Sequence, residues 1–378
     1  MRLLTVNAGS SSLRIDVVEL PGTGPPQPVH SQHLTEPADS ATARQALDRA
    51  LAEHGDGLDA IAHRLVHSGP DLRTATVVDD DVLAAADRAV SLAPQHLPAA
   101  LGLVRTVRDA RPRLTQVLCP DTAFHRDLPP QAGEYALPAT WRRRFGLRRY
   151  GFHGLSYSWA LRRTAQLLAK SPEDIEVVLA HLGGGSSVCA VRAGRSVDTT
   201  MGFTPLEGVP MSRRSGSVDP GMLLWLLTEG GLTIEELSRG LQQESGLYGL
   251  SDGHSDDTRE LVVAARAGHR AAETSLAVFC HRVRGAIASM ATSLTRLDAV
   301  VFTGEIGWDQ AEVRTAVCAG LGLLGVPPAT GANRDDDGAV SPPGASPLVL
   351  VVQPREELSL ALASAAALGQ ATHATEGG

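Results

Sequence analysis

The chain is poor in aromatic residues, in paired cysteines and in long apolar runs. Aromatic residues make up 4% of its 378 residues, which leaves little material for stacking nucleic-acid bases. Its four cysteines lie far apart without a Cys-x-x-Cys pair, a spacing that fits neither a zinc site nor a disulfide framework. No stretch reaches the roughly 18 apolar residues of a membrane span, and Met1-Arg2-Leu3 enters a strand-like run rather than a secretory leader. We therefore expect a cytoplasmic protein with reduced thiols in its core.

The charge balance is acidic, with a formal net charge of −8. This balance argues against a general binder of nucleic acid, because affinity for a phosphate backbone requires clustered Lys and Arg. One basic run departs from it, Trp141-Arg142-Arg143-Arg144-Phe145 with Arg148-Arg149, and we interpret this run as a solvated surface patch. We expect neither nucleic acid nor a membrane among the partners.

The length of 378 residues exceeds what one hydrophobic core usually supports, so two domains are expected. A β-rich run, a turn of small residues and a second β-rich run occur twice, in residues 3–13 and 177–188, and each occurrence predicts a hairpin. This repeat indicates an internal duplication in which each domain offers a turn to one ligand. Helical patterns, the longest from about Thr258 to Leu294, alternate with strands and predict an α/β fold.

Three turns have a composition suited to phosphate binding. In Asn7-Ala8-Gly9-Ser10-Ser11-Ser12, glycine permits close approach of the backbone, hydroxyls can donate to oxyanions, and the amide can hold a phosphate or a magnesium-bound water. A serine-rich turn alone is more often structural, but its echo at residues 181–187 favours a functional role. A third apolar run leads into Thr303-Gly304-Glu305-Ile306-Gly307 and a helix, a common way to bring backbone amides to a nucleotide.

Several charged residues and histidines stand in settings that suit anion binding. Arginine binds phosphate and carboxylate groups through its planar donor fork. Arg64 lies within the motif-like segment 62–69, and Arg214 lies within the polar loop 211–216. Taken singly, each arginine would more often form a surface ion pair. His153 lies in Gly151-Phe152-His153-Gly154, where the backbone can approach a ligand closely. Asp121 and the pair Glu356-Glu357 are candidates for positioning and for magnesium, while the alternative for the glutamates is a charged first helix turn.

Taken together and in order, these segments resemble the acetate kinase family of the sugar kinase, actin and Hsp70 superfamily. The resemblance covers nearly the whole chain through the motifs at residues 6–14, 63–67, 121–125, 150–156, 181–183, 201–208, 302–304 and 356–358. It implies an α/β fold of two duplicated RNase H-like domains, each a mixed sheet flanked by helices, with a ligand cleft between them. The domains implied are residues 1–124 plus about 358–378, and residues 125–357.

The resemblance also implies an activity, in which the γ-phosphate of ATP passes directly to a small organic acid to give an acyl phosphate and ADP. Mg²⁺ or Mn²⁺ is the implied metal, and a homodimer the implied assembly. The residues that match catalytic positions of the family are Arg64, Asp121, His153 and Arg214. Those that match the acyl site are Val66, Gln95, His96, Phe152 and Pro205. The nucleotide side corresponds to Ser10, Ser12, Arg14, His181, Gly183, Gly184, Gly185, Asp256, Arg259, Gly304, Glu305, Ile306 and Gly307, and the metal side to Asn7 and Glu356.

Departures from the family pattern concern both substrates. Gln95 stands where an apolar residue is usual, and a buried amide is a poor match for a methyl group, so we hypothesise an acid more polar or larger than acetate. On the donor side, Gly184 replaces Asn, Glu305 replaces Gly, and Trp308-Asp309 replaces Glu-Asn. ATP is the expected donor, with GTP, CTP or pyrophosphate as alternatives.

Two other functions compete with this one. A catalytically weakened homologue could bind nucleotide or acyl phosphate as a sensor, but the chain retains the four residues at catalytic positions. A sugar-type kinase would need an aspartate base to deprotonate a hydroxyl, a part that Asp121 could take. Two arginines at the point of transfer suit an anionic acceptor better.

Overall fold

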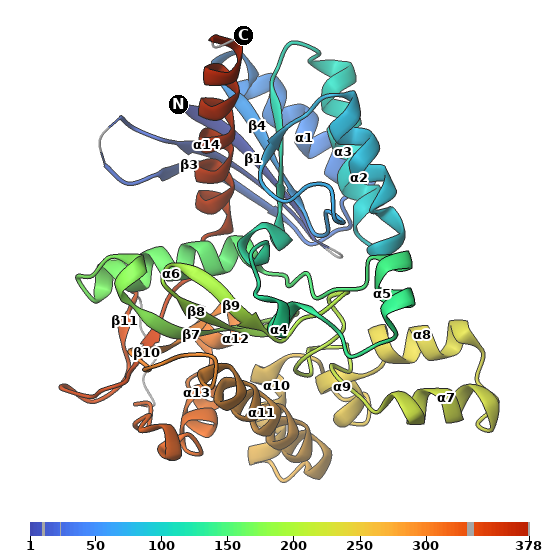
Figure 1. The fold of residues 1–378 in the computed structure, drawn as a ribbon, viewed down its shortest axis with the longest axis vertical. Helices are drawn as coiled ribbons and strands as arrows, with labels where there is room; N and C mark the ends of the chain where they lie inside the picture. The colour runs from blue at the N-terminus through green and yellow to red at the C-terminus, as the bar shows by residue number, and fades with distance from the viewer. Residues whose placement is uncertain (10–11, 23, 331–335, 377–378) are drawn as a thin grey trace. The chain divides into compact units, whose positions relative to one another are not determined.

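The computed structural model describes residues 1–9, 12–22, 24–330 and 336–376, with side chains to residue 371, and Figure 1 shows the course of the chain. The chain divides into two compact units. The first consists of Met1–Arg126 with Arg355–Gly378, and the second of Asp127–Pro354. The terminal segment that begins at Arg355 therefore belongs to the unit that contains the N-terminus.

The first unit is built on a six-stranded mixed sheet with the order β3-β2-β1-β4-β6-β5. Strands β1, β2 and β3 form an antiparallel meander, β1, β4 and β6 pair in parallel, and β5 is an antiparallel edge strand. The bounds are β1 Arg2–Ala8, β2 Leu13–Glu19, β3 Gln27–Leu34, β4 Ala60–Leu65, β5 Thr76–Val77 and β6 Gln116–Pro120. The hairpin predicted at residues 3–13 is confirmed, since Ala8 pairs with Leu13.

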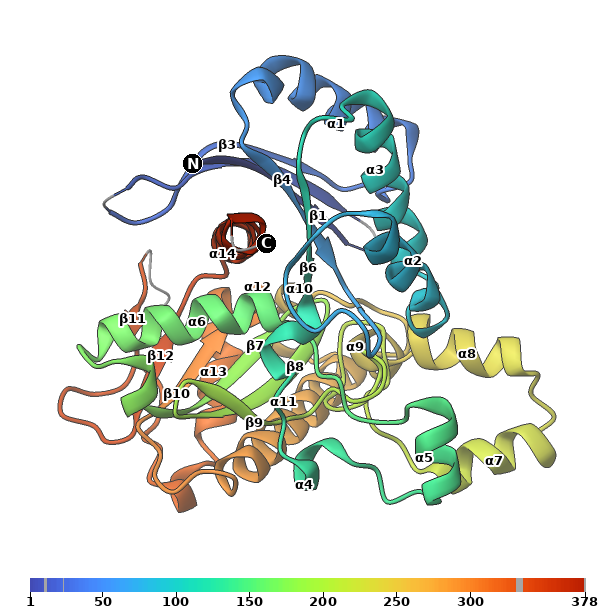
Figure 2. The same cartoon turned by 45° about the horizontal axis from the view of Figure 1, so that its top comes forward.

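Helices cover both faces of this sheet (Figures 1 and 2). Helix α14 packs on β1, β4 and β6, whereas α1 and α3 bury Leu47, Leu103 and Val107 against Leu4 and Ile15 of the other face. Side-chain caps define where helices begin, as when Ser40 accepts a hydrogen bond from the N–H of Ala43 at the start of α1. The helices are α1 Ala41–His54, η1 Gly55–Gly57, α2 Asp80–Arg88, η2 Val90–Leu92, α3 Leu97–Ala110, η3 Asp121–His125 and α14 Glu356–Glu376.

The sheet of the second unit repeats this topology, with the order β9-β8-β7-β10-β12-β11. It again has an antiparallel meander, a parallel set of three strands and an antiparallel edge strand. The bounds are β7 Glu176–Leu182, β8 Ser186–Arg192, β9 Arg195–Thr199, β10 Ala299–Thr303, β11 Gly338–Ala339 and β12 Leu348–Val351. The internal duplication and the second hairpin are therefore confirmed, and the α/β class with them.

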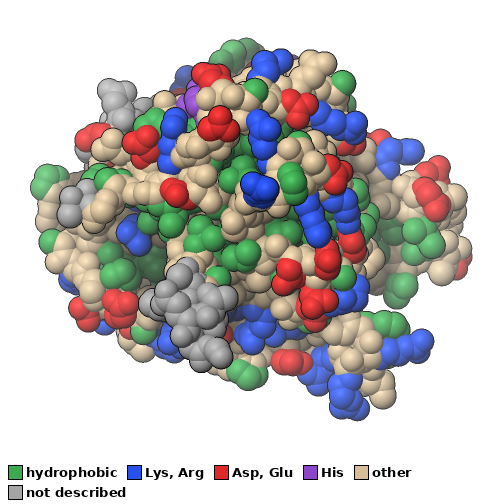
Figure 3. Space-filling model, turned by 90° about the horizontal axis from the view of Figure 1, so that it is seen from above, with side chains coloured by type: hydrophobic (Ala, Val, Ile, Leu, Met, Phe, Trp, Pro, Cys, Tyr) green, Lys and Arg blue, Asp and Glu red, His purple; other side chains and the backbone are tan. Residues whose placement is uncertain are grey.

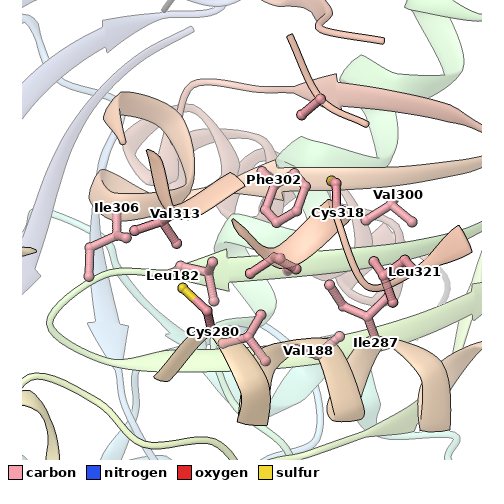
Figure 4. Close-up of a cluster of buried hydrophobic side chains, with 14 of the residues drawn as sticks. Leu182, Val188, Cys280, Ile287, Val300, Phe302, Ile306, Val313, Cys318 and Leu321 are labelled. Atoms are coloured by element: carbon pink, nitrogen blue, oxygen red, sulfur yellow. The ribbon is translucent and has the colours of Figure 1, made fainter. Parts of the chain in front are cut away.

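In the second unit, one hydrophobic core joins the sheet to its helices. Helix α11 packs on β7 and β8, and α6 contacts β7 and β10. Figure 4 shows Phe302 of β10 among Leu182, Ile306, Val313 and Cys318. The helices are α4 Pro130–Gly133, α5 Ala139–Phe145, α6 Gly154–Leu167, η4 Pro172–Asp174, α7 Pro220–Thr228, α8 Ile234–Gln243, α9 Gly246–Leu250, α10 Thr258–Arg266, α11 Arg270–Ala291, α12 Gly304–Asp309, α13 Ala311–Cys318 and η5 Gly322–Leu324.

The single helical stretch predicted from about Thr258 to Leu294 is in fact two helices, α10 and α11. Gly268 separates them with a φ of 89°, a left-handed conformation that ends a helix at little cost only for glycine. His269 then caps α11 by accepting a hydrogen bond from the N–H of Ala272. Apolar periodicity continued across the break, so the pattern alone did not reveal it.

The surface carries both signs of charge, and Lys, Arg, Asp and Glu side chains are interspersed over the face drawn in Figure 3. All four cysteines are buried free thiols. Within the described part of the chain, no helix is both long and apolar enough to span a bilayer.

The core of the second unit gives a stability prediction. Replacing the fully buried Phe302 by Ala should lower the free energy of unfolding by about 3–5 kcal/mol, because a cavity replaces a ring packed between sheet and helices. Leu323→Ala is the control, since that side chain is 99% exposed and its loss should cost less than about 0.5 kcal/mol. Urea unfolding followed by circular dichroism measures both. Equal midpoints for the two variants would contradict the assigned core.

Candidate active site

In the first unit, three polar residues lie where the parallel strands end. Asn7 is near the end of β1, Arg64 is near the end of β4, and Asp121 directly follows β6. Parallel strands place their carboxyl ends at one edge of a sheet, which is where α/β proteins bind ligands. Residues distant in the sequence are thereby brought into contact.

A continuous polar network joins these residues to the start of α14. Arg64 donates to one oxygen of Asp121 from Nε (3.0 Å) and from Nη2 (2.6 Å). Its Nη1 donates to Asn7 Oδ1 at 3.0 Å, and Asn7 Nδ2 donates to Glu356 Oε2 at 2.8 Å. The guanidinium therefore has a fixed direction, set by an acid on one side and an amide on the other.

Electrostatics keep Arg64 a cation. Burial alone would lower the pKa of Arg64, but the carboxylates of Asp121 and Glu356 more than offset this effect, and its pKa is raised above the ordinary value. The adjacent His63 behaves differently, since burial lowers its pKa to about 4 despite a 2.8 Å hydrogen bond with Gln116. His63 is thus neutral near pH 7, and its role is structural.

The turn of the first hairpin closes with a hydrogen bond from the N–H of Gly9 to the carbonyl of Ser12 (2.8 Å). A Cβ added at Gly9 would lie 2.9 Å from the Ser12 hydroxyl, so this glycine allows the hydroxyl to fold over the turn. Ser10, assigned to the nucleotide side, lies outside the described residues. Arg14 opposes Asn7 across the hairpin and donates from Nε to Asp16 at 3.1 Å.

The two glutamates at the start of α14 have different surroundings. The side chain of Glu357 is 1% exposed and lies 3.6 Å from Arg14 and 3.7 Å from Arg355, and burial raises its pKa. That of Glu356 is 16% exposed and contacts Asn7. Of the two, Glu356 is the one that solvent and ions can reach.

The residues expected at the acyl site are divided between the units. In the first unit, Val66 is buried directly after β4, His96 is half-buried before α3, and Gln95 is exposed. In the second unit, Phe152 is buried and Pro205 is half-buried. The amide of Gln95 is therefore accessible, not enclosed in the core of its own unit.

In the second unit, two histidines stack beside the second hairpin. The ring centroids of His153 and His181 are 4.1 Å apart, with 23° between the ring planes. Each Nδ1 lies 2.8 Å from a serine hydroxyl, that of Ser187 for His153 and that of Ser156 for His181. Both rings therefore have their Nδ1 atoms engaged within the protein.

The glycine turns of this unit pack closely together. Gly304 has a φ of 78°, and a Cβ there would collide with the carbonyl of Leu182, so only glycine fits. A Cβ added at Gly183 would lie 3.6 Å from the backbone nitrogen of Glu305, whereas Gly184 faces open space. The turn at residues 183–185 and the start of α12, which includes Ile306 and Gly307, thus form one glycine-lined surface.

Arg214 lies at the same turn. Its Nη1 donates to the carbonyl of Pro205 at 3.1 Å and comes within 4.0 Å of a Cβ added at Gly185. The same added Cβ would lie 2.9 Å from His153 Nε2. Arg214, His153 and the glycine turn are therefore neighbours.

The residues assigned to the adenosine side are mostly held by ion pairs. Asp256 accepts from Arg213 Nε at 2.6 Å, and the guanidinium of Arg213 lies 4.3 Å from the ring centroid of Tyr248. Arg259 binds Asp257 at 2.8 Å and is mostly exposed. Glu305 is exposed at the first turn of α12.

Sequence reasoning missed the partners of the two histidines, Ser156, Tyr157 and Ser187. Tyr157 lies in the first turn of α6, four residues after His153, which directly precedes that helix, and Ser187 pairs with His181 across the hairpin. Arg213 was considered beside Arg214 as a candidate but was given no role. The helical spacing was a usable signal, but the cross-strand partner depended on the register.

No group of three or more His, Cys, Asp or Glu side chains suited to hold a metal occurs among the described residues. Glu356 with Asn7 nevertheless fits Mg²⁺, which typically takes one or two protein carboxylates and fills its other positions with phosphate oxygens and water.

Comparison with known proteins places this arrangement in a family. The acetokinase family model matches residues 29–362. The chain is 39% identical to the acetate kinase of Synechococcus sp. (96% of this chain, 98% of that one) and 39% identical to that of Deinococcus radiodurans (98% of each). Its structure superposes on acetate kinase from Porphyromonas gingivalis with a TM-score of 0.85 at 29% identity, covering 97% of this chain and 99% of the other. A propionate kinase from Francisella tularensis gives the same TM-score at 31% identity, with coverage of 96% and 98%. The chain therefore belongs to the acetokinase family and is, by that membership, a kinase that phosphorylates a carboxylate group.

Proposed function

We propose that this chain moves the γ-phosphate of ATP, with Mg²⁺, directly onto a short organic acid that is more polar or larger than acetate. The observation that carries the proposal is the guanidinium of Arg64, which Asp121 and Asn7 hold at the ends of the parallel strands. A rigid, permanently charged donor fork suits an acceptor that is itself an anion.

In the proposed reaction, a carboxylate oxygen attacks the γ-phosphorus, and the bond to the oxygen that bridges the β- and γ-phosphates breaks. The electron pair of that bond leaves with ADP, and no covalent enzyme intermediate forms. Catalysis then consists of positioning and of neutralising negative charge. Arg64 and Arg214 supply that positive charge.

Asp121 acts in this scheme through Arg64. An ionised carboxylate placed against an anionic acceptor would repel it, whereas the two hydrogen bonds that Arg64 donates to Asp121 fix the arginine. The family resemblance, which puts Asp121 at a catalytic position that orients the carboxylate, implies a more direct role than this one. We therefore assign Asp121 to positioning.

The second unit supplies the nucleotide side. His153 and Arg214 face the turn at residues 183–185, where backbone N–H groups and the absence of side chains suit phosphate oxygens. The adjoining start of α12 and the Asp256 region are assigned to the nucleoside. Glu305 is exposed there and can turn its carboxylate away from the phosphates, so ATP stays the proposed donor.

For the metal, we assign Glu356 as the protein carboxylate and Asn7 as the residue that orients it. When bound, Mg²⁺ would neutralise phosphate charge. Glu357 is excluded from this role by its burial against Arg14 and Arg355.

We also propose a homodimer formed through α7 and α8 of the second unit. Three exposed apolar side chains mark this surface: Leu224 at 65%, Trp225 at 56% and Ile234 at 71%. No residue of α7 is buried within its own chain, and a helix that is apolar on all sides normally packs against something. The neighbouring α5 (Figure 2) carries three arginines, and α8 carries two glutamates in its first turn, so the two helices would have complementary charges across a dimer interface.

A cytoplasmic location is proposed as well. The substrate ATP is available there, and the four cysteines are free thiols, as expected in a reducing compartment.

The first prediction concerns the acceptor. In an ADP-release assay with ATP and Mg²⁺, kcat/KM on hydroxy, keto or amino acids should exceed that on acetate by about tenfold, because the amide of Gln95 can hydrogen-bond a polar substituent. Gln95→Leu should shift the ratio toward acetate by a similar factor. Trapping the product with hydroxylamine shows that it is an acyl phosphate.

Three results would contradict this scheme. Equal kcat/KM on acetate and on the polar acids, unchanged by Gln95→Leu, would remove the acceptor hypothesis. Faster turnover with GTP, CTP or pyrophosphate would overturn ATP as the donor, and nucleotide binding without turnover on any acid would favour the sensor.

The second prediction concerns the Arg64–Asp121 pair. Arg64→Lys and Asp121→Asn should each lower kcat by about 100-fold, since a lysine cannot reproduce the fork and an amide cannot anchor it. Arg88→Lys is the matched control, because Arg88 contacts Asp71 through the same atoms, at 3.2 and 2.7 Å, in an exposed pair. That variant should stay within about twofold of the parent. If Asp121→Asn matched the parent in kcat, the positioning role would be wrong.

The third prediction concerns assembly. Trp225→Ala should raise the dimer dissociation constant at least about 30-fold, because a large aromatic anchor is lost from the interface. Sedimentation velocity over a concentration series measures this change, with Leu323→Ala as the exposed apolar control. A monomeric parent, or an unchanged dissociation constant for Trp225→Ala, would refute the interface.

A further inference from the structure

Behind His153 lies a chain of two hydroxyl groups that the family assignment leaves without a role. Ser187 Oγ is 2.8 Å from His153 Nδ1 and 2.5 Å from the hydroxyl of Tyr157. Ser187 and Tyr157 are completely buried, and His153 is nearly so. Buried hydroxyl groups in series have few ways to arrange their protons, so the donor and the acceptor of each hydrogen bond can be inferred.

The backbone places these groups together. His153 precedes α6 with a φ of 59°, and Tyr157 follows one helical turn later, where its backbone N–H donates to the carbonyl of His153 at 2.9 Å. Ser187 is opposite His181 in the β7–β8 pairing. The contact thus depends on the helix start and the hairpin register together.

The proton of Tyr157 goes to Ser187. A phenol is a better donor than an aliphatic hydroxyl, and the backbone N–H of His181 already donates to the Tyr157 oxygen. Burial holds the pKa of Tyr157 well above its ordinary value, so the phenol keeps its proton at neutral pH. Ser187 then accepts from Tyr157 and has its own proton left to donate.

That remaining proton is directed at His153 Nδ1, the other close partner of Ser187. A neutral imidazole that accepts at Nδ1 carries its proton on Nε2. His153 Nε2 faces the glycine turn, since a Cβ added at Gly185 would lie 2.9 Å from it. The N–H therefore faces the turn assigned to phosphate, whereas the opposite tautomer would present a lone pair to an anion.

We propose that Ser187 and Tyr157 are positioning residues that hold His153 as the Nε2–H tautomer, with its donor directed at the turn of residues 183–185. The inference rests on the proposed role of His153 in phosphoryl transfer. It adds to that role a reason why the ring donates to phosphate from a fixed direction.

The kinetic test uses Ser187→Ala and Tyr157→Phe, alone and combined, in the full-length chain. Ser187→Ala should lower kcat about 10- to 100-fold and leave KM for ATP nearly unchanged, because the donor is misdirected while nucleotide contacts remain. Tyr157→Phe should lower kcat less, and should have no further effect once Ser187 is alanine. In a His153→Ala background, Ser187→Ala should leave the residual rate unchanged.

The spectroscopic test reads the tautomer without turnover. Long-range ¹H–¹⁵N correlation spectra of histidine-labelled protein distinguish Nε2–H from Nδ1–H, and the His153 signals are those lost in His153→Ala. The parent should show the Nε2–H pattern, and Ser187→Ala should lose it. Ser158→Ala is the matched control, because that hydroxyl, on the same helix, donates to the carbonyl of Gly154 at 2.8 Å and not to His153.

The outcomes separate this inference from the proposed function. If His153→Ala retained the parent kcat, the assigned role of His153 would fail. If His153→Ala were slow but Ser187→Ala matched the parent in kcat and in tautomer, only the positioning inference would fail. An Nδ1–H pattern in the parent would overturn it outright.

Discussion

Parallel pairing of the central strands is the constraint on which the rest of the structure depends. In each unit, three parallel strands end at one edge of the sheet, and an antiparallel hairpin adds its turn there. Asn7, Arg64 and Asp121 meet in the first unit for this reason, although they are far apart in sequence. In the second unit, the same topology brings the turns at residues 183–185 and 304–307 together.

The duplicated architecture serves two kinds of chemistry. In the first unit, Arg64 lies among Asp121, Asn7 and Glu356, and these contacts hold its positive charge in one orientation. In the second unit, glycines occupy the turns, and the stacked rings of His153 and His181 lie beside them. The first unit therefore offers charged side chains to a ligand and the second unit offers exposed backbone groups, although the two sheets have the same strand order.

At both sites, buried polar side chains have hydrogen-bond partners that fix their direction. Arg64 stays a cation because carboxylates offset its desolvation, while His63, beside an uncharged glutamine, becomes neutral. His153 and His181 meet the same requirement through serine hydroxyl groups. Directed donors of this kind suit phosphoryl transfer, in which electrostatic positioning supplies most of the catalysis.

The sequence by itself determined the α/β class, the internal duplication, both hairpins and the family, because alternating apolar runs and glycine turns are local features that neighbouring residues specify. Local patterns could not show that Gly268 divides a helical stretch, that Asp121 contacts Arg64, or that Glu357 is buried while Glu356 is accessible. Local patterns also could not identify Ser187 as a partner of His153, because that contact depends on the strand register. Only the tertiary structure decided these points, because strand register and helix packing choose which distant side chains meet and which lose contact with water.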